Sequence, residues 1–233
     1  MTKRAALNHS FTKFNQFERM HRSALLILIL LLALAPARGV AGAWLRGVGD
    51  GFLSWTIKIQ DGAETLGYST IYAEYGINPD LTVGLDLGSD EFGDHKALGF
   101  VLMPLARDGL HVAFELGAGT LEHGPALRPG LSVGKGLSWG ELGGWWNVDT
   151  RMRIIPDDTE IAIDATLGLN LWDETMLITQ VQQGGPLVDP DFLRIVSSVV
   201  WQVAPGHHME VGLTTALIDA EDFGVKLGMW RSF

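Results

Sequence analysis

The charged side chains of this chain that could do chemistry recur at every second position within alternating stretches. That spacing puts them on one face of an extended strand, with apolar side chains on the opposite face. An isolated charge away from water is costly, so such a face either holds ion pairs or lines a water-filled space. The charged candidates are Lys58, Glu74, Asp86, Glu115, Asp149, Arg151, Glu160, Asp164, Arg194, Glu210 and Lys226, and Tyr72 is a polar candidate beside them.

A hydrolytic site would require a serine and a histidine in contact, with a polar residue that orients the histidine. Hairpin pairing around the turn near residue 205 places His208 opposite Gln202 and Ser198 opposite Gly212. Ser198 and His208 are therefore out of register for a nucleophile–base contact. We predict that the protein is not an enzyme and has no catalytic residues, metal site or cofactor.

The elements that must position the charged candidates are strands. Apolar and polar residues alternate over stretches such as 53–60, 81–88, 110–117, 161–169, 209–214 and 223–229, and a period of two is typical of strands with one apolar face. We expect about twelve strands, centred near residues 56, 71, 85, 100, 114, 131, 147, 165, 178, 197, 212 and 228. Gly-rich or Gln-rich stretches blur the pattern near residues 131, 147 and 178, so ten strands remain possible.

The connections between these stretches alternate in kind. One set is short and rich in Pro, Gly, Asn and Asp, which favour turns; it comprises residues 78–80, 107–109, 172–174 and 205–207. The other set is mostly longer or more acidic and comprises residues 88–96, 121–127, 183–191 and 219–222. Short turns at one rim and larger polar loops at the other are typical of a transmembrane barrel. The aromatic residues near the short turns are expected to form an interfacial girdle; they are Tyr75, Trp139, Trp172, Trp201, Trp230 and Phe233.

A targeting segment precedes the strands. An apolar run over residues 24–35 follows Lys13, Arg19 and Arg22, and small residues come after it. This is the order of a secretory signal, and the run is too short to cross about 30 Å of hydrocarbon as a helix. We predict a signal peptide over residues 1–43, removed after Ala43 or after Ala41, and a barrel domain over residues 44–233.

Charge and cysteine content exclude several classes of protein. Beyond residue 43 the chain has 11 Lys+Arg against 26 Asp+Glu, whereas binding to a nucleic-acid backbone requires a basic surface. We therefore predict no nucleic-acid partner. The chain has no cysteine, so an exported form has no disulfides to stabilise it.

The end of the chain resembles the C-terminal signal of Gram-negative outer-membrane β-barrel proteins, including small porin-like barrels, which finish on Phe after alternating apolar residues. Arg231 departs from that pattern, because an apolar or aromatic residue is usual there. The resemblance implies an outer-membrane location among lipid and lipopolysaccharide. It also implies that the barrel-assembly machinery and periplasmic chaperones recognise Phe223, Val225, Leu227, Met229 and Phe233.

We therefore predict an all-β fold, a transmembrane antiparallel up-and-down β-barrel of about 12 strands that serves as a small porin-like channel or a structural barrel. In such a barrel the candidate residues face the interior. They either form ion pairs that stiffen it or, with seven acids against four bases, line a narrow pore with a weak preference for cations. The alternatives are a secreted soluble β-sandwich that binds a ligand or partner and a lipid-modifying outer-membrane enzyme.

Overall fold

The computed structural model describes residues 42–61, 67–93, 95–121, 124–140, 142–156, 158–185, 191–218 and 223–233. Nearly all of the predicted signal peptide lies outside these ranges. No helix in the described part of the chain is long and apolar enough to cross a membrane.

The described residues form twelve strands, which confirms the predicted number and the three strands in the blurred stretches. The strands are β1 (Gly51–Asp61), β2 (Gly67–Asn78), β3 (Leu81–Asp90), β4 (His95–Ala106), β5 (His111–Leu121), β6 (Gly124–Trp139), β7 (Leu142–Ile155), β8 (Asp158–Trp172), β9 (Thr175–Gly184), β10 (Phe192–Ala204), β11 (His207–Ala216) and β12 (Phe223–Ser232).

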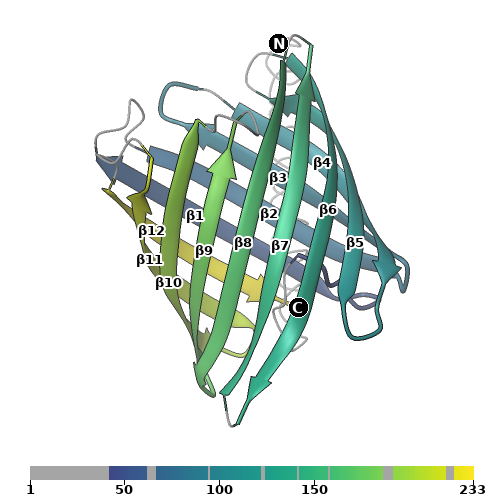
Figure 1. The fold of residues 1–233 in the computed structure, drawn as a ribbon, viewed down its shortest axis with the longest axis vertical. Helices are drawn as coiled ribbons and strands as arrows, with labels where there is room; N and C mark the ends of the chain where they lie inside the picture. Colours follow the sequence, from purple (N-terminus) through teal and green to yellow (C-terminus); the bar gives the residue numbers. More distant parts are fainter. Residues whose placement is uncertain are drawn as a thin grey trace, which may run out of the picture. The chain divides into compact units, whose positions relative to one another are not determined.

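The strands form a closed antiparallel barrel in which each pairs with its neighbours in the sequence (Figure 1). The last strand closes the ring on the first, in a register that runs from Phe52 opposite Ser232 to Asp61 opposite Phe223. Closure leaves no strand with unpaired backbone groups at a sheet edge, which is the condition for a sheet surrounded by lipid.

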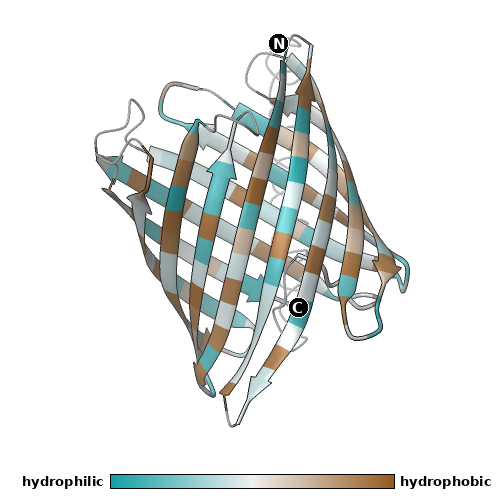
Figure 2. Cartoon of the chain, viewed as in Figure 1, coloured by the Kyte–Doolittle hydropathy of each residue, from teal (hydrophilic) through white to brown (hydrophobic). Residues whose placement is uncertain are grey.

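Hydrophobic and hydrophilic residues alternate along the strands (Figure 2), and this alternation separates an apolar outer face from a more polar interior. Leu85, Leu213 and Leu227 point outward and are roughly half exposed, whereas Glu74, Glu115 and Glu210 are buried inside. A soluble sandwich would bury its apolar faces against each other, so the sandwich alternative is wrong. The interior also contains buried apolar side chains that the sequence analysis did not predict, namely Leu98, Phe100, Leu102, Ala113, Val196 and Val200.

The connections at the two rims differ less in length than expected. The predicted short turns are confirmed, and Gly140 lies in a further turn after β6. However, most of residues 121–127 belong to strands, because β5 extends to Leu121 and β6 begins at Gly124. Gly and Pro suggested a loop there, but Pro125 pairs with Thr120, and the ladder to β7 is irregular around Pro129. An irregularity of this kind accommodates a residue that has no N–H to donate.

The prediction that Trp230 belongs to the aromatic girdle is wrong. Tyr75, Trp139 and Trp172 are exposed on the outside, but the Trp230 indole Nε1 donates a hydrogen bond of 3.1 Å to Glu210 inside the barrel. Even-numbered residues of β12 face the interior, as the buried Ser232 shows. Closeness to the rim therefore does not decide which side of the wall a residue faces.

Candidate functional site in the barrel lumen

Each of the predicted interior residues is buried or half-buried. They come from β1–β3, β5, β7, β8 and β10–β12, since the period-two pattern turns every second side chain inward. Within the lumen they fall into a central ion-pair cluster, a group near the short-turn rim and the walls of two cavities.

The central cluster is built around Glu115 of β5, whose side chain is almost fully buried. Its two carboxylate oxygens accept hydrogen bonds from Arg128 Nε at 2.6 Å and from Arg151 Nε at 3.2 Å. Arg128 of β6 also forms an ion pair with Asp86 of β3. The second oxygen of Asp86 lies 2.7 Å from Lys96 Nζ of β4. Each of these buried charges therefore has an opposite charge beside it, which is what makes their burial tolerable.

Arg151 extends the cluster toward β8. Its guanidinium lies 3.4 Å from Asp164 Oδ2 and 3.9 Å from Asp149 Oδ2. Asp149 also accepts hydrogen bonds from Ser132 Oγ and, at 2.7 Å, from Asn147 Nδ2. The cluster thus connects strands β3 to β8 on one side of the lumen.

Four basic residues of the interior were missed by the sequence analysis: Arg46, Lys96, Arg128 and Arg153. Lys96 falls in a stretch that was expected to be a loop, and Arg128 directly follows another. Alternation continued through this stretch would have placed Arg128 inward. Gly130 and Ser132, which follow it by two and four residues, face the interior as Arg128 does. Arg153 forms an ion pair with the predicted Glu160.

A second group of interior residues lies nearer the short-turn rim. Lys226 Nζ lies 2.6 Å from Glu210 Oε1, and the Tyr72 hydroxyl donates a hydrogen bond of 2.6 Å to Glu74. His208 pairs with Gln202, and Ser198 with Gly212, so the predicted register is confirmed and the serine and histidine remain apart.

The segment before the first strand forms part of the lumen. We call residues 43–50 the N-terminal strap. Its Arg46 Nε lies 2.5 Å from Glu74 Oε2, and the Arg46 backbone N–H donates to Thr82 Oγ1 at 2.9 Å. The Ala43 N–H donates to Asn147 Oδ1 at 3.0 Å. Because these partners face inward from β2, β3 and β7, the strap lies inside the barrel at the short-turn end.

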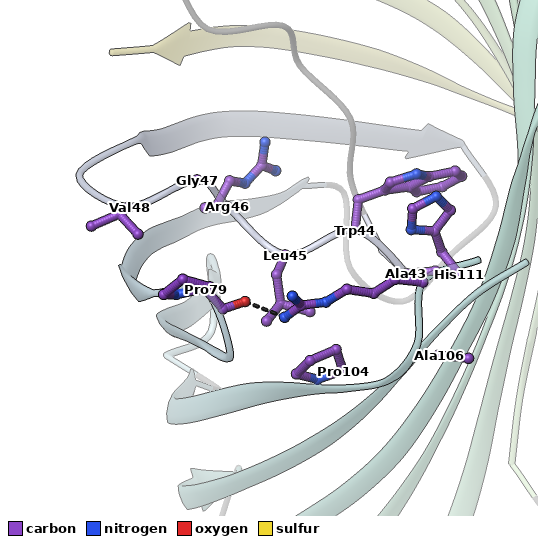
Figure 3. Close-up of a pocket in the computed structure, with 11 residues that line it drawn as sticks. Ala43, Trp44, Leu45, Arg46, Gly47, Val48, Pro79, Pro104, Ala106 and His111 are labelled. Carbon is purple, nitrogen blue, oxygen red and sulfur yellow. Dashed lines mark hydrogen bonds between the residues drawn. The ribbon is translucent and has the colours of Figure 1, made fainter. Parts of the chain in front are cut away.

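Close contacts with the wall fix the strap further. The Trp44 ring packs against the His111 imidazole with centroids 5.1 Å apart (Figure 3). A Cβ atom on Gly76 would lie 1.9 Å from the Gly47 carbonyl oxygen, so the strap approaches β2 more closely than a larger residue allows. The sequence analysis did not predict the strap, because an irregular segment has no period to detect.

Cavities occupy the lumen on either side of the central cluster. The larger, which we call the loop-side chamber, has a volume of about 610 Å³ and is bounded by the strand ends that meet the longer loops. Its charged lining residues are Lys58, Lys96, Arg128, Arg151, Arg153, Arg194, Asp86, Asp90 and Asp164. A smaller cavity of about 200 Å³ lies toward the strap, and Tyr72, Asp149, Glu210 and Lys226 are among the residues that line it.

A third hollow of about 290 Å³ lies beside the strap at the short-turn rim. The strap, His111 and residues of the turns, including Pro79 and Arg107, form its walls (Figure 3).

Comparison with known proteins identifies the architecture. No protein-family model matches the sequence, and no curated protein matches it. Among solved structures, the KdgM porin aligns over 78% of this chain and 99% of its own at 6% identity, with a TM-score of 0.61. The NanC porin aligns over 77% and 98% at 8% identity, with a TM-score of 0.60. Omp33 of Acinetobacter baumannii aligns over 81% and 100% at 8% identity, with a TM-score of 0.56.

The chain has the fold of an outer-membrane β-barrel. In such barrels the apolar band faces lipid and the interior is polar, which is how this barrel distributes its side chains. At these identities the likeness concerns the fold alone. What this barrel does must therefore be argued from its own lumen.

Proposed function

We propose that the protein is a narrow channel of the outer membrane that admits small polar solutes. The observation that carries this proposal is that polar side chains surround the loop-side chamber and the smaller cavity. Twelve strands fall between the eight of barrels filled by side chains and the sixteen of open porins. The porins that share the fold support the same function.

The charges of the loop-side chamber favour anions at its entrance. Six bases and three acids line it, and the acid surplus counted from the sequence disappears once Arg46, Lys96, Arg128 and Arg153 are included. Asp86 and Glu115 are held in ion pairs. We therefore propose a weak preference for anions in place of the cation preference expected from the sequence.

The strap narrows the other end of the channel. In outer-membrane barrels the short turns face the periplasm, so we propose that the strap lies at the periplasmic mouth and the loop-side chamber opens outward. Ala43 is buried and bonded to Asn147. This contact favours removal of the signal peptide after Ala41, which leaves the strap attached to the mature chain.

We also propose that this barrel is exported and then assembled through its last strand. Phe223, Leu227 and Met229 are exposed on the outer face of β12, where the assembly machinery and chaperones could contact them before lipid and lipopolysaccharide surround the barrel. The Ser198–His208 separation supports a protein that is not an enzyme.

Two measurements test the channel. The outer-membrane fraction is first run on a gel with and without boiling, since a closed barrel resists detergent until heated. The purified protein is then inserted into a planar bilayer. We expect a heat-dependent shift and discrete conductance steps with a reversal potential that indicates anion preference. A heat-shifting barrel that gives no steps would refute the channel and favour a structural barrel.

A further inference from the structure

The smaller cavity of the lumen has aromatic rings on opposite sides. Trp145 of β7 and Trp230 of β12 both line it. In the closed ring of twelve strands β7 lies opposite β1, and β1 is the neighbour of β12. The two indoles therefore reach inward from opposite parts of the wall. Because aromatic rings attract cations, a small cation in this cavity would have such a ring on either side.

Contacts with the wall hold both indoles in place. A Cβ atom on Gly168 of β8 would clash with the Trp145 ring, so this ring occupies the space that a larger residue would fill. The Trp230 Nε1 donates a hydrogen bond of 3.1 Å to Glu210, and the Trp230 ring meets the Phe52 ring edge-on with centroids 6.0 Å apart. Side chains that are already ordered lose little freedom when a ligand binds, which favours binding.

The charged residues that line the smaller cavity leave a surplus of one negative charge. They are Asp149, Glu210 and Lys226. Lys226 Nζ lies 2.6 Å from Glu210 Oε1, so the charges of these two residues cancel each other. The remaining charge is that of Asp149, which is buried in the lumen.

Asp149 is also the acid of the central cluster that lies farthest from a base. Its ion pair is with Arg151 Nη2 at 3.9 Å. The Arg151 guanidinium lies closer to Glu115 and Asp164, at 3.2 and 3.4 Å, and it lines the loop-side chamber on the other side of the cluster. The hydrogen bonds that Asp149 accepts come from a hydroxyl and an amide, which are neutral. A cation in the smaller cavity would therefore supply opposite charge to this carboxylate.

The lining favours a small organic cation over a metal ion. Metal ions such as Ca²⁺ require several oxygen ligands at short distances, and the part of the chain that the structure describes has no group of three His, Cys, Asp or Glu that could hold one. Aromatic rings, in contrast, are typical of sites that recognise quaternary ammonium groups. The volume of about 200 Å³ lies below the usual range of drug-sized sites, so the ligand must be small.

We propose that Trp145, Trp230 and Asp149 form a binding site for the ammonium group of a small organic cation, such as a quaternary ammonium compound, in the smaller cavity. The central cluster separates this site from the basic loop-side chamber, so the lumen has two regions of opposite charge. The proposal rests on the proposed channel only in that a solute must reach the cavity. Binding and conductance are therefore measured separately.

The test is calorimetric titration with choline of the barrel solubilised in a maltoside detergent, which carries no ammonium group. The matched ligand is the alcohol in which a carbon atom replaces the choline nitrogen, because it has the shape of choline without the charge. We expect saturable binding of choline and none of the alcohol. Asp149→Asn should weaken choline binding about tenfold or more, since an attraction between opposite charges is lost. Trp145→Leu should weaken it about threefold or more, as the loss of a cation–π contact does.

Two control variants carry the same kinds of change outside the cavity. Asp80→Asn removes a negative charge at the short-turn rim, where Asp80 pairs with Arg107, and Trp172→Leu removes an indole exposed on the outside. Both should bind choline as the unmodified protein does. Trp145→Phe keeps an aromatic ring and should retain more affinity than Trp145→Leu. Each variant is first checked for the heat-dependent gel shift.

Several results would overturn the site. These are the absence of choline binding by a folded, conducting barrel, equal binding of choline and the uncharged alcohol, and equal binding by Asp149→Asn and the unmodified protein. Displacement of choline by an equal concentration of potassium ions would overturn the assignment of an organic cation. Choline binding by a barrel that does not conduct would refute the channel and leave the site in place.

Discussion

Arg46 Nε lies 2.5 Å from Glu74 Oε2, and the side chains of these two residues are only 6% and 1% exposed. Glu74 belongs to the wall and Arg46 to the strap, so this ion pair joins the segment before the first strand to the inside of the barrel. The Tyr72 hydroxyl supports the pair by donating to the other Glu74 oxygen at 2.6 Å.

Glu74→Ala should release the strap and widen the channel. Removal of one partner from a buried ion pair costs about 3–5 kcal/mol, and Arg46 can regain water by leaving the lumen while the barrel stays closed. We expect a higher single-channel conductance and faster protease cleavage within residues 43–50. Glu160→Ala, which removes the half-exposed partner of Arg153, is the control and should leave protease cleavage within residues 43–50 unchanged. Unchanged conductance in Glu74→Ala would show that the strap does not limit flow.

Gly76→Ala should displace the strap by sterics alone. The added Cβ would lie 1.9 Å from the Gly47 carbonyl oxygen, and a backbone atom cannot rotate away as a flexible side chain can. We expect the same rise in conductance and protease sensitivity as in Glu74→Ala. Gly99→Ala is the matched control, because its Cβ would meet no atom within 4 Å. A strap that stays protected in Gly76→Ala would contradict the close contact.

Glu115→Ala should destabilise the barrel itself. The substitution leaves Arg128 and Arg151 without the carboxylate that both contact, at a cost of about 3–5 kcal/mol. Urea unfolding in lipid vesicles measures the loss. Asp80→Asn breaks the exposed ion pair with Arg107 and should cost less than about 1 kcal/mol. Equal stabilities of the two variants would mean that the central cluster contributes nothing.

Leu85→Arg tests whether Leu85 lies in the band of the barrel that faces lipid. Leu85 lies near the middle of β3 and is 52% exposed, and an arginine at the bilayer midplane costs about 2–4 kcal/mol. Leu105→Arg places the same side chain near the end of β4, at the short-turn rim, where the cost falls to about 0–1 kcal/mol. The free energy of unfolding in vesicles distinguishes the two, and an equally small loss in both would argue against a lipid-facing band at Leu85.

The number of strands and the register were predictable because alternation and hairpin pairing are local properties of the sequence. The pairing of Ser198 with Gly212 follows by counting from the turn. Trp230 was misplaced because nearness to the rim was given more weight than its even position in β12. Arg128 and Lys96 were missed because Gly, Pro and acidic residues resemble loops even where the backbone continues to pair.

The strap and the ion-pair cluster depend on contacts that local patterns do not encode. Arg128 meets Asp86 from 42 residues away, and the choice among several possible acids is set by the curvature of the closed wall.

The position of the strap also sets the order of assembly. Although the strap precedes every strand in the chain, the Ala43 N–H bonds to Asn147, a separation of 104 residues. Its docking site requires inward-facing residues from β2, β3, β5 and β7, so it does not exist until those strands have paired. The part of the chain that precedes every strand is therefore expected to be among the last to dock, and an incompletely closed barrel would keep an unoccupied mouth at its short-turn end.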